Sequence, residues 1–161
     1  MVVAPLPRAR TRARIRRAWP HEAPVLSALA VRSKASWGYG PAEMAVFERE
    51  LRVAPDALAR GRAFVFEAGG RVAGFYTLED EADAGLELGH LFVEPAFMGR
   101  GVGTRLLEHA RAQARRAGRL RLRVQSDPHA ERFYRMRGAV RLRLTASSIP
   151  GRSLPLLEIE L

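Results

Sequence analysis

The sequence contains no cysteine and no long hydrophobic run. Without cysteine the chain forms neither disulfide bonds nor thiolate metal sites, so cysteine usage leaves the redox compartment open. No stretch approaches the ~18 consecutive apolar residues of a membrane-spanning helix. Lysine is almost absent as well, because Lys34 is the only lysine among 27 basic residues. We therefore expect a cytoplasmic chain without a membrane partner.

The chain is strongly basic, with a formal net charge of +10. Such a surface attracts an anionic cofactor or a nucleic acid, whereas coding bias toward arginine would explain the same composition without any partner. Six arginines and no acid occupy the first twenty residues. We expect residues 1–12 to form a solvated, flexible tail, with a nucleic-acid arm or a transit peptide as alternatives. Residues 13–161 have the size of a single domain with its own core.

The most informative stretch runs from Leu86 to Arg116. Its first eight residues are apolar enough for a buried strand, which Pro95 ends because proline has no N–H for a sheet ladder. Glycine recurs at Gly99, Gly101 and Gly103. Small or apolar residues then follow at helical spacing: Val102, Leu106, Leu107, Ala110, Ala114 and Ala117. This order predicts a strand, a glycine-rich loop and an amphipathic helix whose N-terminal amides suit a phosphate.

Known phosphate loops with defined spacing do not match this glycine loop. It lacks the Gly-Lys-Ser/Thr of a Walker loop, and Thr104 stands where G-x-G-x-x-G requires its third glycine. Two interpretations remain at this point. The loop is either a pyrophosphate cradle of another kind or a glycine-rich turn between strand and helix that binds nothing.

The rest of the chain alternates between helical and strand patterns. Helices are predicted for residues 21–33 and from Pro41 onward, and an Arg14–Ala18 strand precedes them. Gly69-Gly70 joins two strands of a predicted hairpin. Residues 79–85 form an acidic loop that either binds a cation or, as we favour, is a solvated turn. Further strands are predicted for residues 119–124, 140–144 and 156–161, the last two as an antiparallel pair.

A second stretch that points to a function runs from Ser126 to Ala139. Asp127 is a good helix N-cap, Pro128 a good first helical residue and Gly138 a good terminator. Together with the glycine loop, this stretch resembles the GNAT N-acetyltransferase superfamily. Gly101 and Gly103 match its motif Q/R-x-x-G-x-G/A, with Met98 in place of Gln or Arg. The pattern N-x-x-A-x-x-x-Y-x-x-x-G-F is matched by Ala130, Tyr134 and Gly138, with Asp127 and Ala139 replacing Asn and Phe.

The resemblance implies an α/β (α+β) GNAT fold, with a mixed, mostly antiparallel central sheet flanked by helices. It implies acetyl-CoA as acyl donor and no metal. The main chain of the central strand would provide an N–H for the oxyanion, and the glycine-loop amides would hold the pyrophosphate, with Arg100 and Arg105 as charge partners. The expected cofactor-binding residues are Leu91, Phe92, Val93, Met98, Gly99, Arg100, Gly101, Val102, Gly103, Thr104, Asp127, Ala130 and Tyr134.

Acetyl transfer to an amine needs a base for the amine and an acid for the thiolate. The resemblance implies Glu87 as the base, and His90 is a second candidate because its ordinary pKa is ~6.5. Three residues apart on a regular strand, they would face opposite sides unless a bulge intervenes. Tyr134, with an ordinary pKa of ~10, is the candidate acid. Each residue also has a structural alternative: an ion pair with arginine for Glu87, and packing for His90 and Tyr134.

The sequence does not identify the acceptor of the acetyl group. Two aromatic residues in a glycine-flanked break, Trp37 and Tyr39, either pack on the core or form a wall of the acceptor pocket. We expect an acetyl-CoA-dependent N-acetyltransferase that acts through a ternary complex, preferably on a small-molecule amine. The alternatives are a protein N-terminus or lysine as acceptor, a non-catalytic acyl-CoA sensor, and a nucleic-acid-binding module, which charge alone favours. We expect no nucleic-acid partner and leave a homodimer open.

Overall fold

The computed structural model describes residues 12–81 and 85–161 of the chain. The predicted tail, except for Arg12, and residues 82–84 of the predicted acidic loop therefore lie outside the described residues. The N-terminal part consists of β1 (Arg14–Arg17), α1 (Ala23–Ala35), α2 (Pro41–Glu50) and α3 (Pro55–Ala59). A 3₁₀ turn, Pro20–Glu22, leads into α1. None of the described helices has the length and apolar character that a membrane crossing requires.

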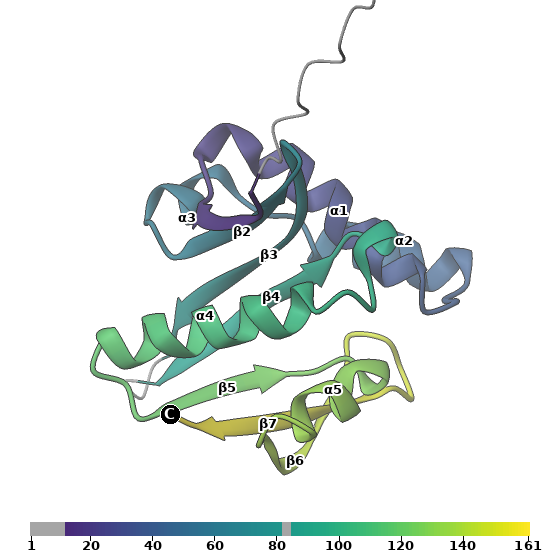
Figure 1. The fold of residues 1–161 in the computed structure, drawn as a ribbon. Helices are drawn as coiled ribbons and strands as arrows, with labels where there is room; N and C mark the ends of the chain where they lie inside the picture. Colours follow the sequence, from purple (N-terminus) through teal and green to yellow (C-terminus); the bar gives the residue numbers. More distant parts are fainter. Residues whose placement is uncertain (1–11, 82–84) are drawn as a thin grey trace, which may run out of the picture.

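Seven strands form one mixed sheet in the order β1-β2-β3-β4-β5-β7-β6 (Figure 1). The strands that follow β1 are β2 (Ala63–Ala68), β3 (Arg71–Asp80), β4 (Leu86–Val93), β5 (Arg121–Gln125), β6 (Val140–Ala146) and β7 (Ser153–Glu160). Every neighbouring pair is antiparallel except β4 and β5, which are parallel. The expected mostly antiparallel mixed sheet is confirmed. A parallel pair needs a crossover, which α4 (Val102–Arg116) provides.

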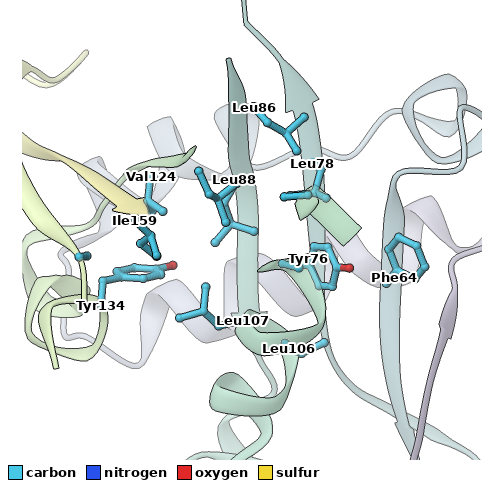
Figure 2. Packing of buried hydrophobic residues seen from close by; sticks show 14 of the residues in the cluster. Phe64, Tyr76, Leu78, Leu86, Leu88, Leu106, Leu107, Val124, Tyr134 and Ile159 are labelled. Atoms are coloured by element: carbon cyan, nitrogen blue, oxygen red, sulfur yellow. The ribbon is translucent and has the colours of Figure 1, made fainter. Parts of the chain in front are cut away.

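Helices cover the sheet on both faces. The apolar stripe of α4 packs on one face, where Leu106, Leu107, Ala110 and Ala114 are buried as predicted (Figure 2). Ala117, the last member of the predicted stripe, is exposed because α4 ends at Arg116. The other face is packed by α1 and α3 through a second cluster that contains Leu26, Leu29 and Leu58. The sheet thus separates two hydrophobic cores, and any site that spans both faces must pass through a gap between strands.

Such a gap lies between β4 and β5. The two strands are registered through a single pair of described residues, Glu87 and Arg123. Figure 1 shows them running apart toward their carboxyl ends, with the beginning of α4 and α5 (Glu131–Arg135) at the open end. Main-chain groups of β4 beyond Glu87 therefore lack a partner strand on the β5 side. Unpaired main-chain groups in the middle of a sheet are costly unless a ligand or water satisfies them.

A β-bulge changes which residues of β4 share a face. Thr77 of β3 is opposite His90, whereas its neighbour Leu78 is opposite Leu88, so Gly89 is the extra residue on β4. Leu88 packs in the α4 core, and so do Leu91 and Val93 beyond the bulge. Glu87 and His90 consequently lie on the same face of the sheet, not on opposite faces as a regular strand would place them. The sequence offers Gly89 as the only sign of this bulge.

Other predicted elements differ in detail. The helix expected after Asp127 is a 3₁₀ turn, Pro128–Ala130, continued by the short α5. Helix α3 was not anticipated from the sequence. Val25, assigned by its spacing to the apolar face of the first helix, is 53% exposed. The glycine hairpin is confirmed, because Gly69 and Gly70 both have positive φ in the turn between β2 and β3.

Candidate active site

A cavity of about 810 Å³ opens where β4 and β5 separate. Its walls come from both faces of the sheet. On the α4 side it is lined by the glycine loop and the first turn of α4. On the α1 side it is lined by residues of α1, of α2 and of their connection, including Lys34, Phe47 and Trp37. The connection between β6 and β7 closes it with Ser147, Ser148 and Arg152. The cavity therefore joins two compartments of different chemistry through the gap in the sheet.

The glycine loop adopts the conformation that its glycines allow. Gly99 and Gly101 have φ values of +72° and +80°, and Gly101 is the N-cap of α4. A Cβ built at either position meets no atom within 4 Å, so neighbouring atoms leave the space above both residues free. Both line the cavity. The N-terminal amides of α4, together with its dipole, therefore face an open space that fits a pyrophosphate.

Most of the residues expected to bind the cofactor are brought together here. Those lining the cavity are Leu91, Phe92, Val93, Met98, Gly99, Gly101, Val102, Gly103, Thr104, Asp127, Ala130 and Tyr134. Arg100 is not among the lining residues, and its guanidinium lies 5.7 Å from the ring centroid of Phe97. Arg105 is also outside the lining and lies over the ring of Phe66. The loop side of the cavity thus offers amides, while the two arginines within the loop and helix turn away.

The main chain of β4 presents free donors to the cavity. The N–H of Glu94 donates to the carbonyl of Ala73 on β3 at 2.8 Å. Because N–H groups alternate in direction along a strand, those of Leu91 and Val93 point away from β3, toward the side where β5 has separated. Both residues line the cavity. These N–H groups are suitably placed for a carbonyl oxygen that gains negative charge.

Tyr134 lies at the base of the cavity. It belongs to α5, is only 5% exposed, and extends its ring toward Leu88 and Leu107 (Figure 2). Within the described residues, no group forms a hydrogen bond with its hydroxyl, and burial raises the pKa of Tyr134. A neutral hydroxyl with no protein partner, in the wall of the cavity, is available as a proton donor.

The two candidate bases do not line the cavity, and their surroundings differ. His90 is held through Nδ1 by the hydroxyl of Thr77 at 2.9 Å and also hydrogen-bonds the backbone of Leu51. Burial lowers the pKa of His90. Burial raises the pKa of Glu87, and the carboxylates of Glu81 and Glu79 add to this shift. His90 is engaged by Thr77 through Nδ1 and by the backbone of Leu51, whereas Glu87 is a carboxylate with increased basicity.

Arg137 is a charged lining residue on the α4 side that sequence reasoning missed. Arg137 donates to Oγ1 of Thr104 from Nη2 at 2.6 Å and from Nε at 3.1 Å, and to the carbonyl of Phe133 from Nη1 at 2.8 Å. Its guanidinium carbon lies 4.0 Å from the centroid of the Phe133 ring. Arg137 therefore places a positive charge at the start of α4, three residues after the tyrosine of the second motif.

The expected acceptor residues Trp37 and Tyr39 have separate roles. Trp37 lines the cavity and stacks on His129, with 5.3 Å between ring centroids and 8° between planes. Tyr39 is not a lining residue. Its hydroxyl hydrogen-bonds Oδ2 of Asp127 at 2.8 Å, and Asp127 also binds Nζ of Lys34 at 2.5 Å. Sequence reasoning overlooked Lys34, although it is the only lysine of the chain and stands three residues before Trp37.

Comparison with known proteins agrees with this geometry. The sequence model of the acetyltransferase (GNAT) domain matches residues 59–138, which contain β4, the glycine loop and the Tyr134 motif. The chain belongs to the GNAT superfamily. A search of curated protein sequences found no match. Among the described residues of this GNAT chain, no group of histidine and carboxylate side chains could hold a metal ion.

Solved structures share the GNAT fold along nearly the whole chain. A GCN5-related N-acetyltransferase from Rhodopseudomonas palustris is 23% identical with a TM-score of 0.77, over 95% of this chain and 98% of that one. PaiA N-acetyltransferase from Thermoplasma acidophilum, solved with coenzyme A, is 18% identical with a TM-score of 0.74, over 94% and 100%. The Escherichia coli ribosomal-protein-S18-alanine N-acetyltransferase is 17% identical with a TM-score of 0.68, over 92% and 94%.

Proposed function

We propose that this GNAT chain transfers the acetyl group of acetyl-CoA to a primary amine, by direct attack in a ternary complex, with a small-molecule amine as the favoured acceptor. The observation that carries the proposal is the cavity through the gap between β4 and β5. It joins a glycine-loop compartment on the α4 side to a second compartment on the α1 side. Donor and acceptor can therefore enter from opposite faces of the sheet and meet between the strands.

The donor contributes an activated acyl group, as the thioester of coenzyme A. The reaction forms a C–N bond and breaks a C–S bond, and the acceptor ammonium loses two protons, one to the thiolate and one to solvent. The amides of Gly99 to Thr104, with Arg137 beside them, would hold the pyrophosphate. The N–H groups of Leu91 and Val93 would stabilise charge on the carbonyl oxygen.

We assign the acid and the base within this proposal from their surroundings. Tyr134 would donate the proton to the leaving thiolate, because its hydroxyl is neutral, unpartnered and part of the cavity wall. Glu87 would accept the amine proton through water, since it lies beside the gap but not in the cavity lining. His90 would be structural, because Thr77 holds its Nδ1 and burial lowers its pKa.

The choice of Glu87 predicts a pH dependence. A base must be ionised to act, so kcat/KM should rise as pH increases through the pKa of Glu87, which lies above its ordinary value. Glu87→Gln should remove this acidic limb and lower kcat/KM on the order of tenfold, the modest size reflecting transfer through water. His90→Gln is the matched control, because it should lower the midpoint of urea unfolding while leaving the acidic limb in place. If the acidic limb of the pH profile disappears in His90→Gln and persists in Glu87→Gln, then His90 is the base and Glu87 is not.

The proposed function is tested by titrating the purified chain with acetyl-CoA in a calorimeter, followed by thiol detection across a panel of amines. Micromolar binding together with amine-dependent release of coenzyme A is the expected result. Binding followed by turnover of peptides alone would favour a protein N-terminus or lysine as acceptor. Binding without turnover of any amine or peptide would favour a non-catalytic sensor. Absence of binding would contradict the proposal.

A further inference from the structure

A buried charged cluster lies at the α1 side of the cavity. Its four members are Lys34 from α1, Tyr39 from the α1–α2 connection, Asp127 at the end of β5 and Arg152 from the β6–β7 connection. Lys34, Asp127 and Arg152 line the cavity. Three of the four therefore surround the space that the acceptor would occupy.

The carboxylate of Asp127 is saturated with donors. It accepts from Nζ of Lys34 at 2.5 Å, from the hydroxyl of Tyr39 at 2.8 Å and from Nη2 of Arg152 at 3.1 Å. It also accepts from the backbone N–H of His129 at 2.8 Å. Burial opposes ionisation of this carboxylate, but these donors bring the pKa of Asp127 below its ordinary value. The carboxylate is therefore an anion with no capacity left for a ligand donor.

Unlike the Asp127 carboxylate, the two cations do not use all of their hydrogen-bonding groups. Lys34 has three N–H donors but forms one hydrogen bond, to Asp127, among the described residues, with the Phe47 ring 4.4 Å away on another side. Arg152 also donates to Oγ of Ser147 and to the hydroxyl of Tyr39. Burial raises the pKa of Tyr39, so it remains a neutral partner. The cluster therefore has unused donors on two residues that line the cavity.

The charge of the cluster is unbalanced. Two cations, with side chains 9% and 14% exposed, share one carboxylate that is 10% exposed. The other acid lining this end of the cavity, Glu50, lies on the exposed surface of α2, from where its charge raises the pKa of Lys34 less than burial lowers it. A buried positive charge without a counter-ion is costly, and an anionic ligand group would offset that cost. Under the proposed function the phosphates of coenzyme A lie on the opposite side of the sheet, beside α4, which leaves the acceptor as the source of this anion.

From this placement we infer that Lys34 and Arg152 form a carboxylate-binding subsite, and that the acceptor is an amine that also carries a carboxylate. The inference rests on the proposed function, because it names the substrate class for that site. Arginine and lysine together suit a carboxylate, through planar paired donors and a point charge. Trp37, stacked on His129 at the same end, would pack against the remainder of the acceptor.

The experiment measures binding of a minimal product pair, N-acetylglycine and N-acetylglycinamide, which differ in the carboxylate. Emission of Trp37 reports binding in a Trp19→Phe background, since the chain has two tryptophans. Titrations are made on the full chain with and without saturating coenzyme A. N-acetylglycine should bind at least tenfold more tightly than the amide. Equal binding, preference for the amide, or no response to either probe would overturn the inference.

Three variants test whether the cluster recognises a carboxylate or only stabilises the fold. Lys34→Met should reduce the preference for N-acetylglycine to within about twofold, and Arg152→Gln should act in the same direction. Asp127→Asn should strengthen N-acetylglycine binding, because it removes the competing negative charge. A structural role would make all three weaken binding. Arg49→Met, which removes a positive charge from the exposed surface of α2, is the matched control and should leave both titrations unchanged.

The same variants distinguish failure of the inference from failure of the proposed function. If coenzyme A does not bind the parent chain, the proposed function fails, and the titrations without coenzyme A still decide the subsite. If Lys34→Met weakens coenzyme A binding more than about threefold, the cluster belongs to the cofactor and the inference is wrong. Thermal unfolding of each variant identifies any loss of binding that comes from loss of the fold.

Discussion

Replacing Gly101 by valine is expected to raise the Kd for coenzyme A at least a hundredfold. Gly101 is the N-cap of α4 with φ of +80°, and the space above its Cα is open and belongs to the cavity. A valine side chain would occupy that space and would also resist the left-handed conformation that presents the amides of the loop. Calorimetric titration with coenzyme A measures the effect.

Gly118→Val provides the matched control for Gly101→Val. Gly118 has a similar φ of +72° and an equally open Cβ position, but it follows the other end of α4, outside the cavity lining. Gly118→Val should therefore lower the free energy of unfolding as much as Gly101→Val does, on the order of 1–2 kcal/mol, because of backbone strain. It should not change the Kd for coenzyme A. Tight binding by a folded Gly101→Val variant would show that the pyrophosphate lies elsewhere.

Tyr134→Phe is expected to lower kcat on the order of a hundredfold while the Kd for acetyl-CoA stays within twofold. The substitution removes one hydroxyl that no described residue binds, so packing in the core should survive. Loss of a positioned general acid typically costs 10²–10⁴ in rate. Steady-state kinetics with a competent amine measures kcat, and calorimetry measures the Kd. Unchanged turnover would remove Tyr134 from the mechanism.

Tyr76→Phe is the control that separates chemistry from stability. Tyr76 is also a buried tyrosine next to α4, but its hydroxyl hydrogen-bonds Nδ1 of His109 at 2.7 Å and it does not line the cavity. Loss of the Tyr76 hydroxyl should leave Nδ1 of His109 without its hydrogen-bond partner and lower the free energy of unfolding by about 1–3 kcal/mol. Turnover should remain near that of the parent chain. The two variants together therefore separate a catalytic hydroxyl from a structural one.

Two of the three departures from the family motifs, Met98 and Asp127, have different consequences in the structure. Met98 removes a side-chain donor from the glycine loop, and Arg137 supplies a guanidinium at the start of α4, hydrogen-bonded to Thr104. Asp127 caps the turn after β5 as predicted, because it accepts from the N–H of His129. The rest of its carboxylate is committed to Lys34, Tyr39 and Arg152, which sequence reasoning did not connect with it.

The sequence by itself determined the family, the order of most elements and the position of the two motifs. Glycine, proline and apolar spacing encode local backbone conformation, and such signals are readable within a short window around residues such as Gly101 and Tyr134. Gly89, the extra residue of the bulge, was an ambiguous signal, since a lone glycine in a strand has several explanations. The bulge appears only when β4 pairs with β3, and it then places Glu87 and His90 on one face.

Only the tertiary structure decided which side chains share the cavity. Lys34 and Asp127 are 93 residues apart in the chain, and Tyr39 and Arg152 are 113 apart, yet all four form one cluster. Contacts over such separations depend on the topology that brings α1, β5 and the β6–β7 connection to the gap in the sheet. The hydrophobic periodicity of the sequence does not predict these contacts, because each residue is compatible with its own helix, strand or loop whether or not the other three are nearby. The acceptor subsite that we propose depends on such contacts, whereas the glycine loop that we propose for the donor was predicted from local sequence.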